Sequence, residues 1–226
     1  MLKEIISLKD ISRFYNNRKI KALNNITLSI SQGEFVSVTG PSGSGKSTLL
    51  NIMSGLDRPD KGEIFFKSQK VENNKTWIDI RSRNIGFVFQ KFNLLPTFTA
   101  LENVEIPMFG IVDSSRERRN KATELLYQMG LEDRMNHYQS ELSGGEQQRV
   151  AIARSLANTP DIIFADEPTG NLDSKTSETI ISLLMDIHLK FNRTLVIVTH
   201  DEEIAKISNR KINILDGKIV NESFKR

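Results

Sequence analysis

The sequence predicts an α/β fold with a mainly parallel sheet, and three observations support this prediction. Short apolar runs rich in β-branched residues, with the length of buried strands, recur along the chain. Helical patterns follow most of them, an alternation typical of a parallel sheet covered on both faces. Mostly helical patterns over residues 91–158 interrupt the alternation. We therefore expect one domain over 1–226, with a core made of 1–90 and 159–226 and an inserted helical subdomain over 91–158.

The individual elements follow from periodicity and from glycine at their ends. Gly55 and Gly130 each follow a helical pattern and are plausible C-terminal stops. Asp216-Gly217 between two short apolar runs predicts a hairpin, and 92–112 looks irregular and apolar. The pattern of 174–191 places Ile180, Ile181, Leu183, Leu184 and Ile187 inward. Expected strands are 21–30, 35–39, 62–66, 85–89, 161–165 and 195–199; expected helices are 46–54, 115–129, 143–158 and 174–191.

Composition excludes several classes of protein. Hydrophobic residues make up 38% of the 226, enough for a core, and the charges that give a net +3 are interleaved, so we expect no nucleic-acid partner. The absence of cysteine excludes disulfides and thiolate metal sites. The sequence shows neither a signal peptide nor an apolar run of roughly 18 residues. We expect a cytosolic protein, with any membrane parts on other chains.

Residues 40–48 match the phosphate-loop pattern, with an expected strand before them and an expected helix after them. Glycines let backbone N–H groups converge on phosphate oxygens, and the helix N-terminus adds partial positive charge. Lys46 is expected to reach the β and γ phosphates, and Ser47 to offer its hydroxyl to Mg²⁺. The predicted nucleotide-binding residues are Gly40, Pro41, Ser42, Gly43, Ser44, Gly45, Lys46, Ser47 and Thr48.

Two carboxylates end the apolar run before Pro168. We expect Asp166 to hold Mg²⁺ and Glu167, on the other side of the strand, to polarise the attacking water; the two roles could be swapped. His200 follows the strand 195–199 and could contact the γ-phosphate. Taken alone it could equally lie in a helix cap, since Thr199 and Glu202 have capping-box spacing. We interpret His137 and His188 as structural.

A second glycine-bearing turn, Ser143-Gly144-Gly145, opens another expected helix. Ser143 and Glu146 have capping-box spacing, so the turn could simply start that helix. A helix N-terminus with two glycines also presents free N–H groups to a phosphate. Two phosphate receptors in one chain predict that two copies share ATP head to tail.

The order and spacing of these motifs resemble the nucleotide-binding domains of ABC transporters over essentially the whole chain. The resemblance implies a P-loop NTPase core with an N-terminal antiparallel β subdomain and an inserted helical subdomain. It implies that Gln90 links Mg²⁺ and the water to the transporter, so that Ser47, Gln90 and Asp166 are the metal ligands. Tyr15 resembles the aromatic residue that stacks on adenine, although Phe14 competes for that role, and Asp173 resembles a contact to the partner copy.

Residues 93–104 and 166–173 resemble the branch that includes lipoprotein-release, macrolide-export and antimicrobial-peptide-export ATPases. The implied function is an ATPase that uses ATP and Mg²⁺, forms a homodimer and drives a separate permease from the cytoplasmic side of the membrane. A septal cell-division ATPase that regulates a membrane partner without transport is the alternative. A small-molecule kinase would leave 142–149, Gln90 and His200 unexplained. The expected dock for the permease is the apolar set Phe92, Leu94, Leu95, Pro96 and Phe98, and the alternative for each of these side chains is packing inside the helical subdomain.

Overall fold

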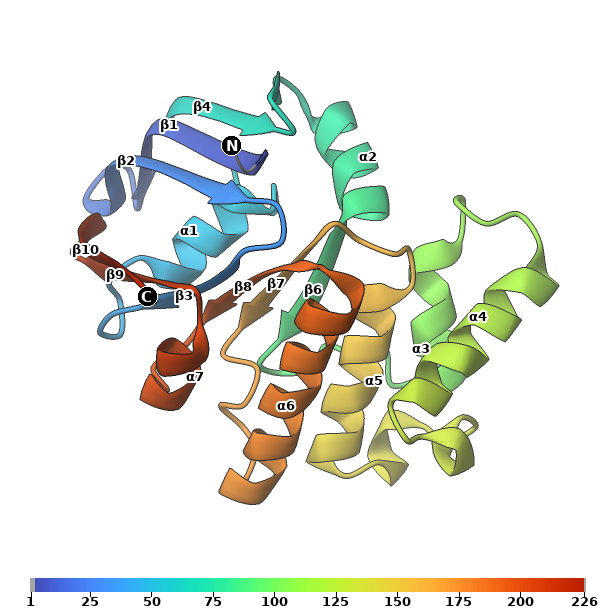
Figure 1. The fold of residues 1–226 in the computed structure, drawn as a ribbon. Helices are drawn as coiled ribbons and strands as arrows, with labels where there is room; N and C mark the ends of the chain where they lie inside the picture. The colour runs from blue at the N-terminus through green and yellow to red at the C-terminus, as the bar shows by residue number, and fades with distance from the viewer. Residues whose placement is uncertain (1–2, 226) are drawn as a thin grey trace. The chain divides into compact units, whose positions relative to one another are not determined.

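Two structural units make up the chain in the computed structural model, which describes residues 3–225. The first unit is Met1–Arg81 with Asn192–Arg226, and the second unit is Ser82–Phe191 (Figure 1). The first unit is therefore assembled from two separate stretches of sequence, whereas the second is continuous. The expected division into a core and an inserted subdomain over 91–158 stays a prediction.

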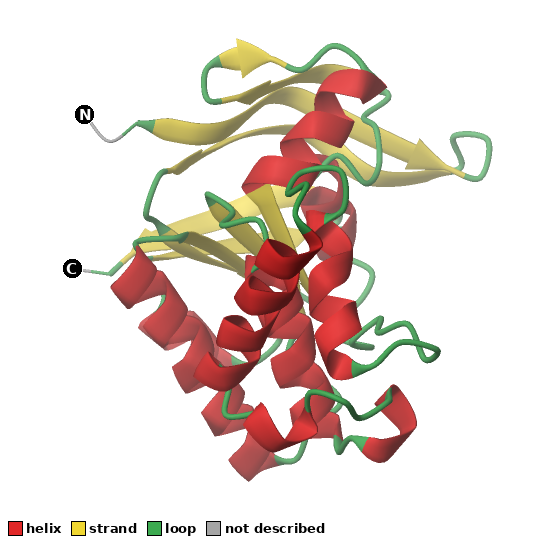
Figure 2. Ribbon diagram, turned by 90° about the vertical axis from the view of Figure 1, so that its right-hand side faces the viewer, coloured by secondary structure: helices red, strands yellow, loops and turns green. Residues whose placement is uncertain are grey.

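An antiparallel sheet forms one layer of the first unit. Its strands are β1 (Glu4–Tyr15), β2 (Ile20–Ser31), β4 (Lys61–Phe66) and β5 (Gln69–Lys70), in the order β2-β1-β4-β5. β1 pairs with β2 and with β4 in antiparallel register, and residues such as Ile6, Leu8 and Ile11 are fully buried beneath it. The antiparallel N-terminal layer implied by the sequence is present (Figure 2).

The first unit also carries four strands in the order β10-β9-β3-β8. β3 (Phe35–Thr39) pairs in parallel with β8 (Thr194–Val198) and with β9 (Arg210–Leu215), and every residue of β3 and β8 is buried. β10 (Lys218–Phe224) returns antiparallel to β9. Asp216 (φ 47°) and Gly217 (φ 71°) form the left-handed two-residue turn that the sequence predicts for this hairpin.

Helix α1 (Lys46–Met53) contacts β1, β2 and β8. Leu49, Leu50, Ile52 and Met53 are all buried, as expected of a helix covered on more than one side. α2 (Asn74–Asn84) begins in the same unit and buries Trp77 and Ile80, and α7 (Glu202–Ile207) buries Ile204 and Ala205.

The second unit combines two parallel strands with four α-helices. The strands are β6 (Ile85–Phe89) and β7 (Ile162–Asp166). The helices are α3 (Ala100–Glu105), α4 (Ser115–Gln128), α5 (Gly144–Leu156) and α6 (Ser174–Phe191), with short 3₁₀ turns at Ile106–Met108, Glu132–Arg134 and Gln139–Glu141.

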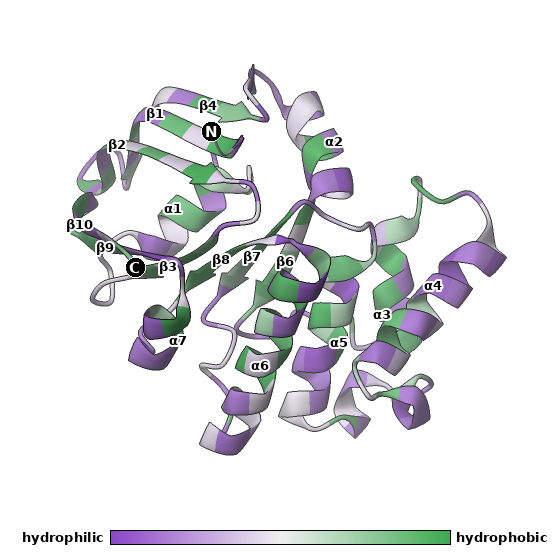
Figure 3. Ribbon diagram, in the orientation of Figure 1, coloured by the Kyte–Doolittle hydropathy of each residue, from purple (hydrophilic) through white to green (hydrophobic). Residues whose placement is uncertain are grey.

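α5 is the central helix of the second unit, because it contacts β6, α3, α4 and α6. Its residues 150–153 are fully buried. In α6 the apolar residues gather along one side, visible as a green stripe in Figure 3. Ile180, Leu184 and Ile187 are buried there as predicted, whereas Ile181 and Leu183 are only half-buried.

Several elements differ from the sequence-based expectations. β1, β5, α2, α3 and α7 were not expected, and 92–112 is not wholly irregular, since it contains α3 and a 3₁₀ turn. Among residues 3–225, none of the helices combines the length and the apolar character that crossing a bilayer requires.

Candidate functional site

The phosphate loop of the first unit connects β3 to α1 through three glycines in the left-handed region. Gly40, Gly43 and Gly45 have φ of 146°, 77° and 107°. A Cβ on Gly40 would lie 2.1 Å from the Ile214 carbonyl oxygen, and one on Gly45 would lie 2.5 Å from the Ala22 carbonyl oxygen. Backbone angle and close approach both require glycine at these two positions.

Lys46 is buried at the start of α1, and its ammonium lies against the loop that precedes it. Nζ donates hydrogen bonds of 2.9 Å to the carbonyl oxygens of Gly40 and Pro41. Its charge is therefore held within the loop, where the sequence places the phosphates.

The N-terminus of α1 fits an anion. Gly45 is the N-cap and provides no side-chain hydrogen bond, and the first turn contains no acidic residue. A Cβ on Gly43 would meet no atom within 4 Å, so the loop is open at that position. Ser44 Oγ is buried and has no partner among the described residues, a state that usually indicates a bound water or ligand. These features fit a polyphosphate.

The loop is supported from behind by the β9–β10 hairpin, a contact that the sequence did not predict. The Gly217 N–H donates to the Ser44 carbonyl oxygen at 2.9 Å, and the Gly217 carbonyl accepts from the Asn24 N–H at 2.8 Å. The hairpin tip thus connects the phosphate loop to β2.

In the second unit, the parallel register of β6 and β7 brings Gln90 beside the acidic pair. Val88 pairs with Ala165 and Phe89 with Asp166, so Gln90 and Glu167 are the residues that directly follow these two neighbouring strands. Asp166 and Glu167 are half-buried, and Gln90 is exposed. The roles of these residues as metal and water ligands stay predictions.

The turn after β7 holds Gln90 from two sides. A Cβ on Gly170 would lie 2.6 Å from Gln90 Nε2, so the carboxamide packs directly on that glycine. Asn171 Nδ2 donates to the Gln90 carbonyl oxygen at 2.8 Å. Glu167 itself has φ 46°, an unusual left-handed angle for a non-glycine residue, and accepts the Gly170 N–H at 3.0 Å through its carbonyl.

Ser143 caps α5 as its capping-box spacing predicts. The Glu146 N–H donates to Ser143 Oγ at 3.3 Å, and the Ser143 N–H donates to Glu146 Oε2 at 2.8 Å. This backbone N–H is the main reason why the pKa of Glu146 lies below its usual value, and Arg134 also lowers it. Gly144 and Gly145 are the first two residues of the helix, whose N–H groups have no acceptor within the helix.

The same turn is closely packed on the segment that follows β7. A Cβ on Gly145 would lie 2.6 Å from Thr176 Cγ2, and one on Gly144 would lie 3.4 Å from Leu172 Cδ2. Asp173 is exposed, accepts the Thr176 N–H at 3.0 Å and accepts the Thr176 hydroxyl at 2.6 Å. These hydrogen bonds lower the pKa of Asp173 and give it a local capping role at the start of α6.

Tyr15 and His200 belong to the first unit. Tyr15 donates its hydroxyl to Asp57 Oδ2 at 2.7 Å, and the Arg13 guanidinium lies 4.7 Å from the ring centroid. His200 is exposed just beyond β8. The capping box that the spacing of Thr199 and Glu202 allowed as an alternative does not form, because Asp201 caps α7 by accepting the Glu203 N–H at 2.8 Å.

The described residues contain no group of three or more histidine, aspartate or glutamate side chains placed to hold a metal. The predicted magnesium ligands are instead one hydroxyl, one amide and one carboxylate, on Ser47, Gln90 and Asp166. This set of oxygen donors fits Mg²⁺, which usually keeps several waters and takes few protein ligands.

The expected permease dock is only partly exposed. Leu95 and Phe98 are 43% and 39% exposed, and Pro96 is also exposed. Leu94 is 6% exposed, so its inclusion in the dock is wrong: it belongs to the core of the second unit.

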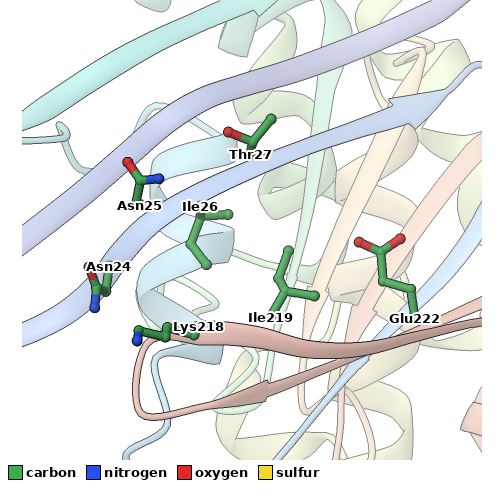
Figure 4. A pocket seen from close by; sticks show the side chains of 7 residues that line it. All are labelled: Asn24, Asn25, Ile26, Thr27, Lys218, Ile219 and Glu222. Carbon is green, nitrogen blue, oxygen red and sulfur yellow. The ribbon is translucent and has the colours of Figure 1, made fainter.

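A cavity of about 530 Å³ lies between β2 and β10 in the first unit. Figure 4 shows Ile26 and Ile219 in the space between these strands. Its other lining residues are polar, and none of the predicted site residues is among them; the lining is Asn24, Asn25, Ile26, Thr27, Lys218, Ile219 and Glu222.

Comparison with known proteins gives strong matches. A family model described as ABC transporter matches residues 23–170. The lipoprotein-releasing system ATP-binding protein LolD of Cytophaga hutchinsonii is 47% identical over 221 residues, which cover 97% of this chain and 100% of that protein. The macrolide export ATP-binding/permease protein MacB of Hyphomonas neptunium is 44% identical over 227 residues, which cover 99% of this chain and 35% of that protein.

Among solved structures, the ATP-binding cassette MJ0796 of Methanocaldococcus jannaschii matches in a dimeric, post-hydrolysis state bound to ADP and Pi. The TM-score is 0.90 at 47% identity, over 98% of this chain and 99% of that chain. This match confirms the predicted fold class.

Proposed function

Because the chain belongs to the ABC transporter family as an ATP-binding subunit and is an ATPase of that family, we propose that it is the motor of a transporter. Two copies close head to tail around two ATP molecules, and this closing and opening drives a separate membrane permease. The observation that carries the proposal is the second phosphate-receptive helix N-terminus, Ser143-Gly144-Gly145, in a chain that already has a phosphate loop. Both receptors are used if each ATP is bound by the phosphate loop of one copy and by the Ser143-Gly144-Gly145 turn of the other copy.

Each copy binds the nucleotide through its phosphate loop. The backbone N–H groups of residues 40–48 and the ammonium of Lys46 receive the phosphates, and Tyr15 packs against the adenine. Lys46 already has a fixed position through its two carbonyl partners, so little side-chain entropy remains to be lost when ATP binds. His200 contacts the γ-phosphate.

Hydrolysis depends on the carboxyl ends of β6 and β7. Members of this family use ATP with Mg²⁺. Ser47, Asp166 and Gln90 would hold this ion, which would supply positive charge to the phosphates. Glu167 accepts a proton from the attacking water. Gln90, packed on Gly170, orients that water and reports the state of the site to the permease.

The signature turn completes the site of the other copy. Gly144 and Gly145 direct N–H groups toward the γ-phosphate of the partner's ATP, and Ser143 adds its hydroxyl. Asp173 contacts the partner. Cleavage of the γ-phosphate removes this bridge, and the two copies separate.

The export branch is the finer part of the proposal. Residues 93–104 and 166–173 resemble that branch, and relatives named for lipoprotein release and macrolide export support it. We propose that the complex exports or extracts a lipoprotein, peptide or macrolide-like substrate, and that this subunit lies peripherally on the cytoplasmic side of the membrane. The exposed residues Leu95, Pro96 and Phe98 are the contact to the permease.

The test is dimer trapping by Glu167→Gln. With this change, ATP affinity stays within about twofold, while turnover falls on the order of a hundredfold or more, as for loss of a general base. Because ATP is no longer cleaved, analytical ultracentrifugation with MgATP shows a stable dimer. Without nucleotide the same variant sediments as a monomer.

The matched control is Ser143→Asp in the Glu167→Gln background. Aspartate is a good N-cap, so α5 keeps its cap, but the new carboxylate repels the γ-phosphate and the dimer is lost. Ser143→Thr keeps both the cap and the dimer. A Glu167→Gln protein that remains monomeric at all MgATP concentrations contradicts the head-to-tail proposal.

A further inference from the structure

The loop that follows Gln90 has an unusual shape. We call residues 91–99 the linking loop, because they connect the end of β6 to α3. Phe92 and Asn93 have φ of 59° and 51°, so two consecutive non-glycine residues are left-handed. Left-handed phenylalanine is disfavoured, and such a pair persists only where its surroundings hold it in place.

Arg154, in the last turn of α5, holds this shape. Its Nη2 donates to the Phe92 carbonyl oxygen at 2.7 Å and its Nη1 donates to the Asn93 carbonyl oxygen at 2.5 Å. The planar guanidinium can donate to two neighbouring acceptors from two separate nitrogens. A lysine ammonium has a single nitrogen and cannot reproduce this geometry. Burial lowers the pKa of Arg154, and among the described residues no carboxylate pairs with it. The half-buried guanidinium of Arg154 thus donates its hydrogen bonds to two backbone carbonyls of the linking loop.

The far end of the same helix carries the signature turn. α5 runs from Gly144 to Leu156 with Ser143 as its N-cap, so the helix spans roughly 20 Å at 1.5 Å per residue. It also lies tightly on β6: a Cβ on Gly86 would lie 2.4 Å from the Ser155 carbonyl oxygen. One rigid element therefore joins the signature turn, β6 and, through Arg154, the linking loop (Figure 1).

We propose that Arg154 is a positioning residue for ATP hydrolysis, which fixes the linking loop to the signature helix and so keeps Gln90 in register with Glu167. The inference rests on the proposed roles of Gln90 and the signature turn. When the signature turn closes on the partner's ATP, the linking loop, which directly follows Gln90, moves with it as one body. Arg154 itself contacts neither nucleotide nor water in this account.

The chain offers a control for the arginine-to-lysine change. In the same unit, Arg118 Nη1 donates to the carbonyl oxygens of Val112 and Asp113 at 2.7 and 2.9 Å. This arginine also binds two consecutive carbonyls, but in the segment before α4, away from Gln90 in sequence. Arg154 uses both terminal nitrogens for its two bonds, whereas Arg118 uses Nη1 alone. Arg→Lys keeps the charge at both positions but removes a two-nitrogen fork only at Arg154.

The experiment compares Arg154→Lys with Arg118→Lys in the full chain. Arg154→Lys is expected to leave ATP affinity, and dimer formation in the Glu167→Gln background, within about twofold, whereas its turnover falls roughly ten- to a hundredfold from misplaced catalytic groups. Arg118→Lys changes none of the three by more than about twofold. Thermal melting checks that both variants are folded. Wild-type turnover in a folded Arg154→Lys protein overturns the proposal, as does loss of ATP binding together with turnover.

A double-mutant cycle separates positioning from a general structural role. If Arg154 acts through Gln90, adding Arg154→Lys to Gln90→Ala lowers turnover no further, so the two effects are not additive. Fully additive effects contradict the proposal. If Gln90→Ala alone leaves turnover unchanged, the role proposed for Gln90 fails first, and that result is distinguishable from failure of Arg154 to act on it.

Discussion

Lys46 shows how a single residue prepares the nucleotide site. Its ammonium is buried and donates to two carbonyl oxygens of its own loop, Gly40 and Pro41. A charged donor that is held by two acceptors has a fixed position. The first turn of α1 contains no acidic residue that could neutralise the charge of Lys46. The positive charge therefore remains available to an incoming phosphate.

Lys46→Ala is expected to weaken ATP binding about ten- to a hundredfold, since it removes charge-assisted hydrogen bonds to the phosphates. Isothermal titration with MgATP measures the affinity. Lys121→Ala is the control, because the half-buried Lys121 makes an exposed hydrogen bond to Thr159 Oγ1 and lies outside the predicted site. Unchanged ATP affinity of Lys46→Ala would count against the phosphate-loop assignment.

At the scale of the element, α5 depends on its N-terminal cap. Glu146 and Ser143 exchange two hydrogen bonds there, and Arg134 adds an ion pair of 2.9 Å to Glu146. The pKa of Glu146 is lowered in the folded state, so folding favours its charged form. This stabilisation is complete above the ordinary glutamate pKa of 4.5 and is lost as the pH falls through the lower, folded value.

Glu146→Gln is therefore expected to flatten the pH dependence of stability. In the wild-type chain the urea midpoint falls as the pH is lowered from about 5 to 3, and in Glu146→Gln the fall is smaller, because glutamine keeps a cap without titrating. Glu102 has a similar cap on α3 and a lowered pKa, so it remains as a residual source of pH dependence. Identical slopes for the two proteins contradict this account.

The sequence predicted elements well where local pattern and burial agree. The strand 35–39 and the helix 174–191 were predicted with their observed bounds, since each is a clear periodic or apolar run between turn residues. β1 was missed because register shifts and left-handed Asp10 break the alternation that identifies a half-buried strand. α2 was missed because only Trp77 and Ile80 of its residues are buried, so its polar sequence has no apolar stripe.

The candidate site was predictable in its motifs and not in its long-range contacts. Glycine and lysine spacing identified the phosphate loop, and the apolar strand before Asp166 identified the acidic pair. The hydrogen bonds from Arg154 to the linking loop join residues about sixty positions apart, so no local sequence pattern predicts them. For the same reason the apolar run around Leu94 could not decide between exposure at the dock and burial inside the subdomain, and the structure shows that Leu94 is buried.

At the scale of the whole molecule, the proposed site is divided between two copies, which permits complementation. A chain with Lys46→Ala cannot bind ATP well but has an intact signature turn. A chain with Ser143→Asp has an intact phosphate loop but a repulsive signature turn. Paired together, they form one complete site from the loop of the second chain and the turn of the first.

An equimolar mixture of these two inactive chains is expected to regain roughly a quarter of wild-type ATPase activity per chain on random pairing, with one good site in half of the dimers. A coupled phosphate-release assay measures the recovery. Each variant alone serves as the control. No recovery in a mixture shown to contain mixed dimers contradicts a site shared between copies.

The contact between Gly217 and Ser44 has a consequence for biosynthesis. The residues that pack against the phosphate loop and hold its shape are near 214–217, whereas the loop itself is at 40–48. A ribosome therefore releases the loop long before it releases the hairpin that shapes it. The nascent chain can complete its continuous unit, 82–191, first, and gains nucleotide affinity only when translation has passed the hairpin.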